Sequence, residues 1–592
     1  MTSPIATAYL VDDTLRAAAN ARGSNYWDAY LAEISEQLGL CAEPISLPAL
    51  ADPSALARYS ALLIGDIPGD RLTSQIRETV GQWVRDGGTL LGLGTDGWDE
   101  LFGNRFQTLL PQLDGPFSLA ARFRLRPHPL TADVHSPLQP NQPLLAFAPV
   151  RAVSPESSTE IGSVVDMQEG GAVITARSVG RGLAWYAGFS VAQTLWVLHK
   201  GRPLTVDRDG DGYLRSSDMV VIGENSILVQ YADELLWLMQ NALGRRRQPL
   251  IHQVPPLQGE VADFLCFWGG DDEAATNGLQ LVASNLMREH DLPYHINVMA
   301  RDGAFGLSPE AARAILANGH ELSLHYNFRD GFQHPYAFTR DDVLAQAAAF
   351  RRTYGIEPVC TVNHCTHWSG WYEPAEWYLE AGSRADNGFV HHKSPPGNPV
   401  NRLGFSFGTA YPHYFYRDYR GGNGRIDFLE EPITGYEVGY TREGTDFPRL
   451  HQMLDHAARY HLTLNMFYHP VYVAEYPTCQ QAIGELRRYL DERGLTVVHL
   501  GNDALWRWWD ARHRSRVTDV QEEGTEIHFL ADCRAPSGMV VKLPLGADTV
   551  AAATVGGLAG KFVLRQEFGQ NWAFLVVPLG THRVSVRAQP AA

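Results

Sequence analysis

Acidic residues and histidines recur through the middle third of the chain, and each group stands at the end of an apolar, strand-like run. The first group is the pair Asp271-Asp272, which follows the mostly apolar run 261–267. The later groups are Gly319-His320-Glu321-Leu322-Ser323-Leu324-His325, Asn363-His364-Cys365-Thr366-His367 and Tyr468-His469-Pro470. The carboxyl ends of parallel strands converge on one face of a sheet or barrel, where catalytic sites form. Carboxylates and imidazoles gathered there can hold a divalent ion, so the pattern indicates a metal-dependent hydrolase.

The segments that must position these groups alternate between strand and helix patterns from about residue 258 to residue 515. Strands are expected at 293–299, 321–325, 356–362 and 462–467 because these runs are apolar and short. Ser308 and Pro309 are typical of the first turn of a helix, and a second helix is expected over 480–493. Repeated strand–helix units predict a parallel, barrel-like sheet.

This central region resembles the NodB-homology polysaccharide deacetylases, a family with a distorted β/α barrel that holds one divalent metal. The resemblance rests on the four groups above and covers about two-fifths of the chain. It implies that Asp271 is the catalytic base, that Asp272 and His325 are metal ligands, and that His469 is the general acid. A pair of acids after a strand more often caps a helix or lies in a loop, so the interpretation depends on the groups occurring together.

Two segments depart from the family pattern. The second metal histidine is expected four residues after His325, but that position is Arg329. An arginine–proline–aromatic motif is replaced by the segment 363–371, from which His364 would complete the ligand set, with His367 in reserve. Asp386, in Arg384-Ala385-Asp386-Asn387, resembles an acidic motif that orients the base. The implied metal is zinc, although a carboxylate with two imidazoles also suits cobalt, nickel or iron.

The resemblance implies hydrolysis of an N-acetyl group on a polysaccharide or oligosaccharide. Two other functions stay open on the same residues. One is a non-catalytic carbohydrate-binding protein on a degenerate deacetylase barrel, which Arg329 favours and which the retention of Asp271 and His469 disfavours. The other is a metal-dependent amidase or esterase that acts on a different substrate.

Residues 1–250 are expected to form a separate α/β domain. Residues 61–65 and 89–93 are strand-like, and Ile76, Val80, Trp83 and Val84 recur between them at helical spacing. The stretch resembles the flavodoxin-like fold of the glutamine-amidotransferase family. Active members of that family carry a cysteine on the turn after such a strand, but here the turn is Gly94-Thr95-Asp96-Gly97. The resemblance therefore implies the architecture without the activity.

An acidic loop near the end of this domain matches a calcium-binding pattern. Asp207, Asp209, Asp211 and Asp218 occupy positions one, three, five and twelve, Gly212 occupies position six, and Tyr213 would offer its carbonyl at position seven. Aspartate at position twelve makes the loop similar to a dockerin calcium loop. We expect a structural calcium ion, and the alternative is a solvated Asp/Gly turn.

The tail from residue 517 to residue 592 changes character. Short β-rich runs at 526–530, 539–543, 572–577 and 583–586 alternate with turns, which predicts a small β-sandwich. The expected organisation is thus an amidotransferase-like α/β domain (1–250), a deacetylase-like β/α barrel (258–515) and a β-sandwich (517–592).

Composition limits the partners. The formal net charge of −17 argues against nucleic acid and anionic membrane surfaces as main partners, while the 14 Trp and 24 Tyr would suit a carbohydrate. The first residues do not form a secretory signal, no apolar run is long enough to span a membrane, and the six cysteines are scattered. A reduced, cytoplasmic setting is the expectation, and secretion is left open as the alternative. The oligomeric state stays open, with a homo-oligomer as one option.

Overall fold

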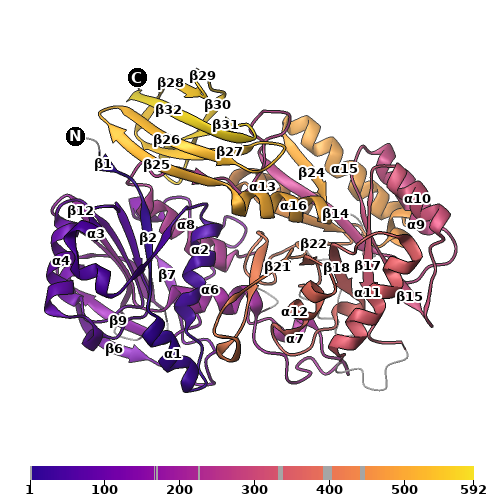
Figure 1. The fold of residues 1–592 in the computed structure, drawn as a ribbon, viewed down its shortest axis with the longest axis horizontal. Coiled ribbons are helices and arrows are strands. Elements are labelled where there is room, and N and C mark those ends of the chain that lie inside the picture. The colour runs from indigo at the N-terminus through magenta and orange to yellow at the C-terminus, as the bar shows by residue number, and fades with distance from the viewer. Residues whose placement is uncertain are drawn as a thin grey trace.

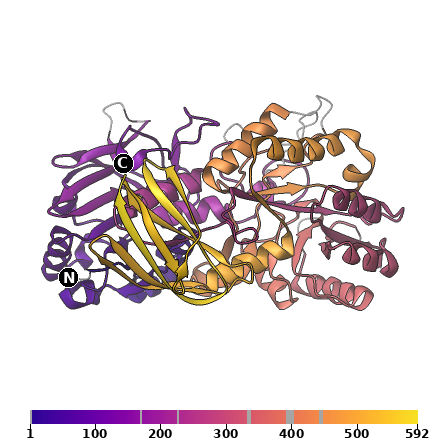
Figure 2. The same cartoon turned by 90° about the horizontal axis from the view of Figure 1, so that it is seen from above.

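The computed structural model describes residues 3–165, 167, 171–223, 227–330, 338–390, 403–440 and 447–591. It confirms the expected fold class, an α/β protein of several parts (Figure 1). An N-terminal mixed sheet lies beside a curled central sheet of parallel strands, and the C-terminal antiparallel sheets lie over the junction between them (Figures 1 and 2). In the part of the chain described, no helix has both the length and the apolar character needed to cross a membrane.

The N-terminal sheet has the strand order β3-β2-β4-β5-β12-β11-β10-β7-β8, and β6 and β9 are attached beside it. Pairing is parallel from β3 to β12 and antiparallel beyond it. The strands are β2 (Thr7–Val11), β3 (Glu43–Ser46), β4 (Ala61–Ile64), β5 (Thr89–Leu93), β6 (Asn104–Leu110), β7 (Ala121–Leu125), β8 (Leu144–Ala146), β9 (Val150–Pro155), β10 (Thr159–Val164), β11 (Ala172–Val179) and β12 (Gly182–Ala187). The helices are α1 (Asp13–Ala21), α2 (Leu31–Gln37), α3 (Pro53–Leu56), α4 (Ser74–Arg85), α5 (Asp99–Phe102), α6 (Val191–Lys200), α7 (Ser216–Met219) and α8 (Tyr231–Leu243).

The predicted strand–helix–strand unit of this domain is present as β4, α4 and β5. Thr73 caps α4, because its hydroxyl accepts a hydrogen bond from the amide of Ile76 at 3.2 Å. Ile76, Val80 and Val84 are buried on one face of the helix, as their spacing predicts. That face packs into the same apolar cluster as Leu62, Ile64 and Leu90 of the two strands.

The central sheet has the order β20-β21-β19-β18-β17-β15-β14-β23-β22, with β24 paired to β14 and β16 to β15. Pairing is parallel throughout except at β20 and β16. The end strands β20 and β22 do not pair with each other among the described residues, so the sheet is curled but does not close into a barrel. The strands are β14 (Phe264–Asp271), β15 (His295–Arg301), β16 (Ala304–Phe305), β17 (Glu321–Tyr326), β18 (Cys360–Asn363), β19 (Ala385–Asp386), β20 (His413–Tyr416), β21 (Arg425–Glu430), β22 (Gly435–Tyr436), β23 (Thr463–Phe467) and β24 (Val497–Gly501).

Helices follow most of these strands, as expected for β-α units. They are α9 (Leu279–Glu289), α10 (Pro309–Ala317), α11 (Arg340–Tyr354), α12 (Glu373–Glu380), α13 (Phe447–Tyr460), α14 (Pro470–Glu475), α15 (Pro477–Arg493) and α16 (Asn502–Arg514). Ser308 caps α10 as predicted, accepting from the amide of Ala311 at 3.2 Å. β18 begins four residues later than predicted, and Pro358 in the missing stretch has no N–H to offer to a ladder.

The C-terminal strands form two antiparallel sheets, as the turn-rich tail predicts. One has the order β1-β25-β26-β32-β28-β29 and the other β13-β27-β31-β30. The strands are β25 (Arg516–Glu523), β26 (Glu526–Cys533), β27 (Met539–Gly546), β28 (Asp548–Val555), β29 (Leu558–Ala559), β30 (Phe562–Glu567), β31 (Gln570–Val577) and β32 (Gly580–Pro590), joined by β1 (Ser3–Pro4) and β13 (Leu250–Ile251) from earlier in the chain.

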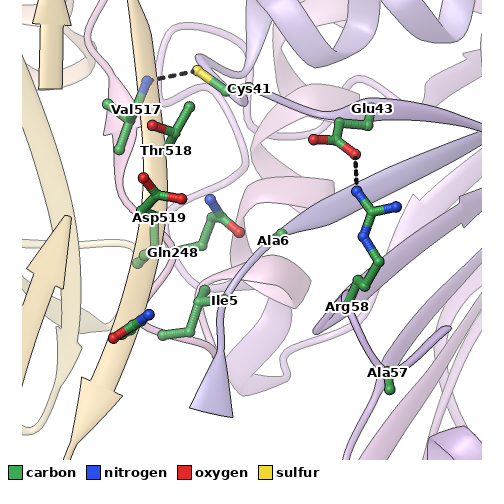
Figure 3. A pocket seen from close by; sticks show the side chains of 12 residues that line it. Ile5, Ala6, Cys41, Glu43, Ala57, Arg58, Gln248, Val517, Thr518 and Asp519 are labelled. Atoms are coloured by element: carbon green, nitrogen blue, oxygen red, sulfur yellow. Dashed lines mark hydrogen bonds and ion pairs between the residues drawn. The ribbon is translucent and has the colours of Figure 1, made fainter. Parts of the chain in front are cut away.

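These two early strands tie the C-terminal sheets to the N-terminal domain. The contact between the two parts leaves a cavity of about 440 Å³ lined by residues of both (Figure 3). On its walls the Val517 amide donates to the Cys41 sulfur at 3.1 Å, and Arg58 pairs with Glu43 at 3.1 Å (Figure 3). The N-terminal and C-terminal parts are therefore packed together through shared strands.

Candidate metal centre

The buried strand β14 brings the first acidic group to the carboxyl edge of the central sheet. All eight of its residues are buried, and Asp271 is its last. A Cβ at Gly270 would lie 1.5 Å from the carbonyl oxygen of Tyr468, so only glycine allows β14 to approach the segment after β23 this closely. That approach places Asp271 and His469, which are almost 200 residues apart in sequence, at the same edge.

Three side chains at this edge form a group that could hold a metal ion. Ligand atoms of Glu273, His325 and His364 all lie within 4.8 Å of one another. Glu273 Oε2 lies 2.9 Å from His364 Nε2, and Glu273 Oε1 lies 3.8 Å from His325 Nε2. We call this group the Glu-His-His cluster. It contains the predicted His325 and His364, together with a glutamate that the sequence analysis did not assign.

The tautomer of His325 suits it to be a ligand. Its Nδ1 lies 3.1 Å from the carbonyl oxygen of Val362, which fixes a proton on Nδ1. Its Nε2 then carries a lone pair toward Glu273, and this buried atom has no hydrogen-bond partner among the described residues. The donor set of one carboxylate and two imidazoles fits a transition metal of the zinc type.

His364 follows β18 in a short 3-10 turn (His364–Thr366). Although burial opposes a positive charge there, hydrogen bonds with Cys365 and Glu273 raise the pKa of His364 to about 10. Burial alone would raise the pKa of Glu273, but its three neighbouring histidines, His325 first among them, lower this pKa below its usual value. A ligating imidazole must have a deprotonated nitrogen, so a cation in the cluster would replace the proton that His364 now shares with the Glu273 carboxylate.

Asp272 points away from the cluster. Its Oδ1 accepts from the amides of Met299 at 2.8 Å and Ala274 at 2.9 Å, and its Oδ2 accepts from Gln280 at 3.0 Å. Burial raises its pKa to about 6, against these hydrogen bonds. In this arrangement Asp272 holds the turn after β14, and Glu273 takes the position facing the histidines. The ligand role of Asp272 stays a prediction, and the geometry favours Glu273 for it.

The backbone turn after β14 explains why Glu273, and not Asp272, faces the histidines. Glu273 and Ala274 have φ values of 54° and 56°, in the left-handed region that side chains other than glycine rarely adopt. Strand β14 ends at Asp271, so the alternation of side chains along a strand does not extend to Glu273. The left-handed turn sets the direction of this side chain, and the residue types gave no signal for that turn.

Asp271 and His469 lie beside the cluster. Asp271 is buried, its Oδ2 lies 3.5 Å from His325 Nδ1, and its Oδ1 has no hydrogen-bond partner among the described residues. His469 Nε2 lies 3.2 Å from Glu273 Oε1, and its Nδ1 pairs with the buried carboxylate of Glu437. Burial raises the pKa of Asp271, whereas Glu437 and Glu273 raise the pKa of His469 against the effect of burial. Glu437 was not predicted, because the two-residue strand before it carries too weak a pattern.

Asp386 occupies the second residue of β19 and is fully buried. Its Oδ2 accepts from the amide of Gly388 at 2.9 Å, and its Oδ1 has no hydrogen-bond partner among the described residues. Burial, with a smaller effect from Asp271, raises its pKa to about 7. It is not part of the Glu-His-His cluster. Its role as an orienting acid stays a prediction.

Arg329 and His367 lie beside the cluster, next to Tyr213 of the acidic loop. Arg329 Nη1 lies 3.4 Å from the Cys365 sulfur, and its guanidinium lies 5.2 Å from the centre of the Tyr213 ring. The His367 ring lies 5.1 Å from that of Tyr213, and burial lowers its pKa to about 3. His367 is absent from the cluster, so His364 is the better placed of the two candidates.

The acidic loop is folded as a compact turn against the β18 side of the central sheet. Carboxylate oxygens of Asp207, Asp209 and Asp211 lie within 4.8 Å of one another. Asp218 is buried and caps the loop: its Oδ1 accepts from the backbone amide of Arg208 at 2.7 Å, and its Oδ2 accepts from the backbone amide of Arg215 at 3.0 Å. Three carboxylates at this distance fit a hard cation such as calcium.

No protein-family model and no curated protein sequence matches the chain. Among solved structures, a family 4 carbohydrate esterase from Streptomyces lividans aligns over 40% of this chain and 93% of its own, at 11% identity and a TM-score of 0.24. A putative ThuA-like protein from Bacteroides uniformis aligns over 32% of this chain and 82% of its own, at 13% identity and a TM-score of 0.22.

A β-galactosidase from Bacillus circulans aligns over 33% of this chain at 15% identity and a TM-score of 0.26, but the alignment spans only 30% of that enzyme. These similarities are distant, and the function proposed below rests on the geometry of the site.

Proposed function

We propose that the protein is a metal-dependent hydrolase that removes N-acetyl groups from a carbohydrate, with Glu273, His325 and His364 as the protein ligands of the metal. The observation that carries the proposal is the Glu-His-His cluster, flanked by Asp271 and His469, at the carboxyl edge of the central sheet. A divalent ion held there supplies Lewis-acid polarisation of the substrate carbonyl and of the attacking water. Zinc is the metal we propose, because the donor set suits it.

Asp271 and His469 divide the proton transfers between them. Oδ1 of Asp271 has no hydrogen-bond partner among the described residues and is available to accept the proton of the attacking water. Burial raises the pKa of this carboxyl toward the range of a useful base. Glu437 holds Nδ1 of His469, so Nε2–H is directed into the site and can protonate the departing sugar nitrogen. The products are acetate and a free amine. Asp386, buried on β19, is proposed to influence the Asp271 carboxyl electrostatically.

A carbohydrate substrate is supported by a group of tyrosines beside His469. The Tyr472 ring lies 5.7 Å from the imidazole of His469 and 4.5 Å from the ring of Tyr440. Tyr440 and Tyr476 are 40% and 36% exposed, and their rings lie 5.3 Å apart. Exposed aromatic faces next to a general acid suit the apolar face of a pyranose, with the hydroxyls left for polar contacts.

The acidic loop is proposed as a separate structural calcium site, with Asp207, Asp209 and Asp211 as side-chain ligands. The Tyr213 carbonyl and the capping carboxylate of Asp218 complete the predicted set. The loop contacts the segment after β18, since Leu214 accepts from the amide of Trp368 at 3.2 Å. Calcium would therefore stabilise the segment that carries His364.

A non-catalytic carbohydrate-binding protein is the second candidate. It is favoured by Arg329, which occupies the position expected for a metal histidine and contacts Cys365 and Tyr213. A binding protein does not account for the pairing of His469 with Glu437, because binding a sugar requires no general acid.

Acetate release separates these functions. Wild-type protein would be incubated with N-acetylated chito-oligosaccharides before and after chelation, and again after addition of zinc. Release that depends on metal and falls at least about 100-fold in His469→Gln supports the proposal. The control is His451→Gln, which alters a histidine paired with Glu485 on α15. Sugar binding without acetate release would establish the binding protein, and release only from O-acetyl sugars would establish an esterase.

A further inference from the structure

A second cavity lies at the opposite edge of the central sheet. It has a volume of about 470 Å³ and is bounded by the end of α9, the turn between α10 and β17, α15 and the start of β24. His320 lies immediately before β17, whereas the cluster residue His325 lies near the end of that strand. The cavity is therefore separated from the metal centre by the length of the strands.

Donor groups outnumber acceptors at one wall of this cavity. His499 Nδ1 lies 3.2 Å from the indole nitrogen of Trp268, and His499 Nε2 lies 3.3 Å from Nη1 of Arg487. Indole and guanidinium nitrogens can only donate, while a neutral imidazole has one acceptor nitrogen and an imidazolium has none. At least one N–H at this wall thus lacks an acceptor among the described residues. Because Trp268 donates to Nδ1, His499 Nε2 carries a proton and faces Arg487.

Burial, assisted by Arg487, lowers the pKa of His499 to about 3, so the ring is neutral near pH 7. Two N–H groups, one from His499 and one from Arg487, then point toward the same region. The two nitrogens are only 3.3 Å apart, so this pair is unfavourable unless an acceptor beside them receives their N–H groups.

His320, in contrast, presents an acceptor nitrogen that needs a hydrogen-bond donor. Its Nε2 donates to the carbonyl oxygen of Ser284 at 2.8 Å, which leaves Nδ1 as an acceptor. The side chain is only 6% exposed, lines the cavity, and its Nδ1 has no hydrogen-bond partner among the described residues. Burial lowers the pKa of His320, so Nδ1 keeps its lone pair. A ligand that satisfies the cavity must accept from the Arg487 side and donate to His320.

Charge points to the same kind of ligand. Although the chain carries a formal net charge of −17, the described lining of this cavity includes two arginines, Arg288 and Arg487, and one carboxylate, Asp291. Arg288 donates one N–H to Asn318 at 2.7 Å, and its guanidinium has further N–H groups that could bind an anion. Guanidinium groups match the paired oxygens of phosphate.

We propose that this cavity binds a phosphate group, either free or as the monoester of a small molecule. Hydrogen phosphate has oxygens to accept from Arg288, Arg487 and His499, and a hydroxyl to donate to His320. A phosphomonoester, whose second pKa is about 6, has no P–OH in its dianion and would donate to His320 through a hydroxyl of its attached group. Sulfate has the oxygens but no hydroxyl, so it would leave Nδ1 of His320 unsatisfied. The cavity is larger than one phosphate group requires, which leaves room for an attached sugar.

Titration calorimetry with inorganic phosphate at constant ionic strength tests the proposal. We expect saturable binding to the wild-type protein, at least tenfold weaker binding to Arg487→Gln, and unchanged binding to Arg488→Gln. Arg488 is the matched control, because it is the next residue of α15 but pairs with Glu485 and Glu492 and does not line the cavity. No saturable binding to the wild type, or equal weakening in both variants, would overturn the proposal.

Two further titrations define the ligand. Phosphate should bind at least tenfold more tightly than sulfate, and this preference should disappear in His320→Ala; equal binding of both anions to the wild type would overturn the role of His320. Glucose 6-phosphate that binds more tightly than phosphate would identify a phosphomonoester as the ligand, and weaker binding would identify free phosphate. Protein treated with a chelator should bind phosphate equally well, so the result is independent of the metal centre.

Discussion

The central sheet should lose stability as the pH rises toward 9, because the buried His295 then loses its positive charge. Both of its ring nitrogens face acceptors, since Nδ1 lies 3.1 Å from Glu321 and Nε2 lies 3.0 Å from Asn297 and 3.1 Å from the Cys360 carbonyl. Only the imidazolium can donate from both nitrogens. Substitution by glutamine removes the charge and leaves the carboxylates of Glu321 and Asp503 without this partner.

The size and sign of the effect follow from the shifted pKa. Burial opposes the charge, but Asp503 and Glu321 raise the pKa of His295 from its usual 6.5 to about 9. A shift of about 2.5 pH units corresponds to about 3 kcal/mol. Because the folded pKa is above the unfolded one, this stabilisation is complete below pH 6.5 and is lost as the pH rises through 9. Asp503, whose pKa burial raises to about 6, is already ionised over most of that range.

Hydrogen exchange of the amides of β15 and β17, corrected for the intrinsic effect of pH, measures the relevant free energy of opening. We expect the wild-type value to fall by about 3 kcal/mol between pH 6.5 and pH 9.5. His295→Gln should be less protected at pH 6.5 and nearly independent of pH above it. The control is His582→Gln, which alters a histidine of the C-terminal sheet. An unchanged wild-type value, or an equal decline in His295→Gln, would refute the reasoning.

Three further predictions concern the strand contact, the general acid and the acidic loop. Gly270→Ala should destabilise the protein by about 3 kcal/mol or more, because its Cβ would meet the Tyr468 carbonyl, whereas Gly484→Ala in α15 should be neutral or stabilising by about 1 kcal/mol in thermal unfolding. Glu437→Gln should lower kcat about 10-fold to 100-fold with little change in KM, since it only positions His469, and an unchanged kcat would count against that role. Calcium at about 100 times its Kd should stabilise the wild type by about 3 kcal/mol and should not stabilise Asp207→Asn, so equal shifts would exclude the loop as the site.

The sequence predicts the frame of the molecule well, because burial imposes clear periodicities. The runs 61–64, 89–93 and 463–467 are strands, and the apolar spacing over 76–84 is a helix, since each buries a continuous apolar face. β1 and β13 could not be predicted. Each has only two residues, and its partner strand lies several hundred residues away in sequence.

The candidate site is predictable in composition and less so in detail. Convergence of Asp271, His325, His364 and His469 follows from their positions at the ends of parallel strands. The choice between Asp272 and Glu273 depends on a left-handed turn at 273–274, a backbone conformation that the residue types do not favour. The pairing of Glu437 with His469 depends on another such residue, as Glu437 has a φ of 50°. Local backbone geometry, which tertiary contacts impose, thus decides which carboxylates face the imidazoles.

Metal content of the purified protein tests the proposed centre most directly, with Glu273→Gln and Asp272→Asn measured beside the wild type. We predict about one equivalent of zinc or a similar metal in the wild type, its loss in Glu273→Gln, and its retention in folded Asp272→Asn, whose side chain can still accept from the backbone amides. Retention in Glu273→Gln together with loss in folded Asp272→Asn would contradict this assignment of the ligands.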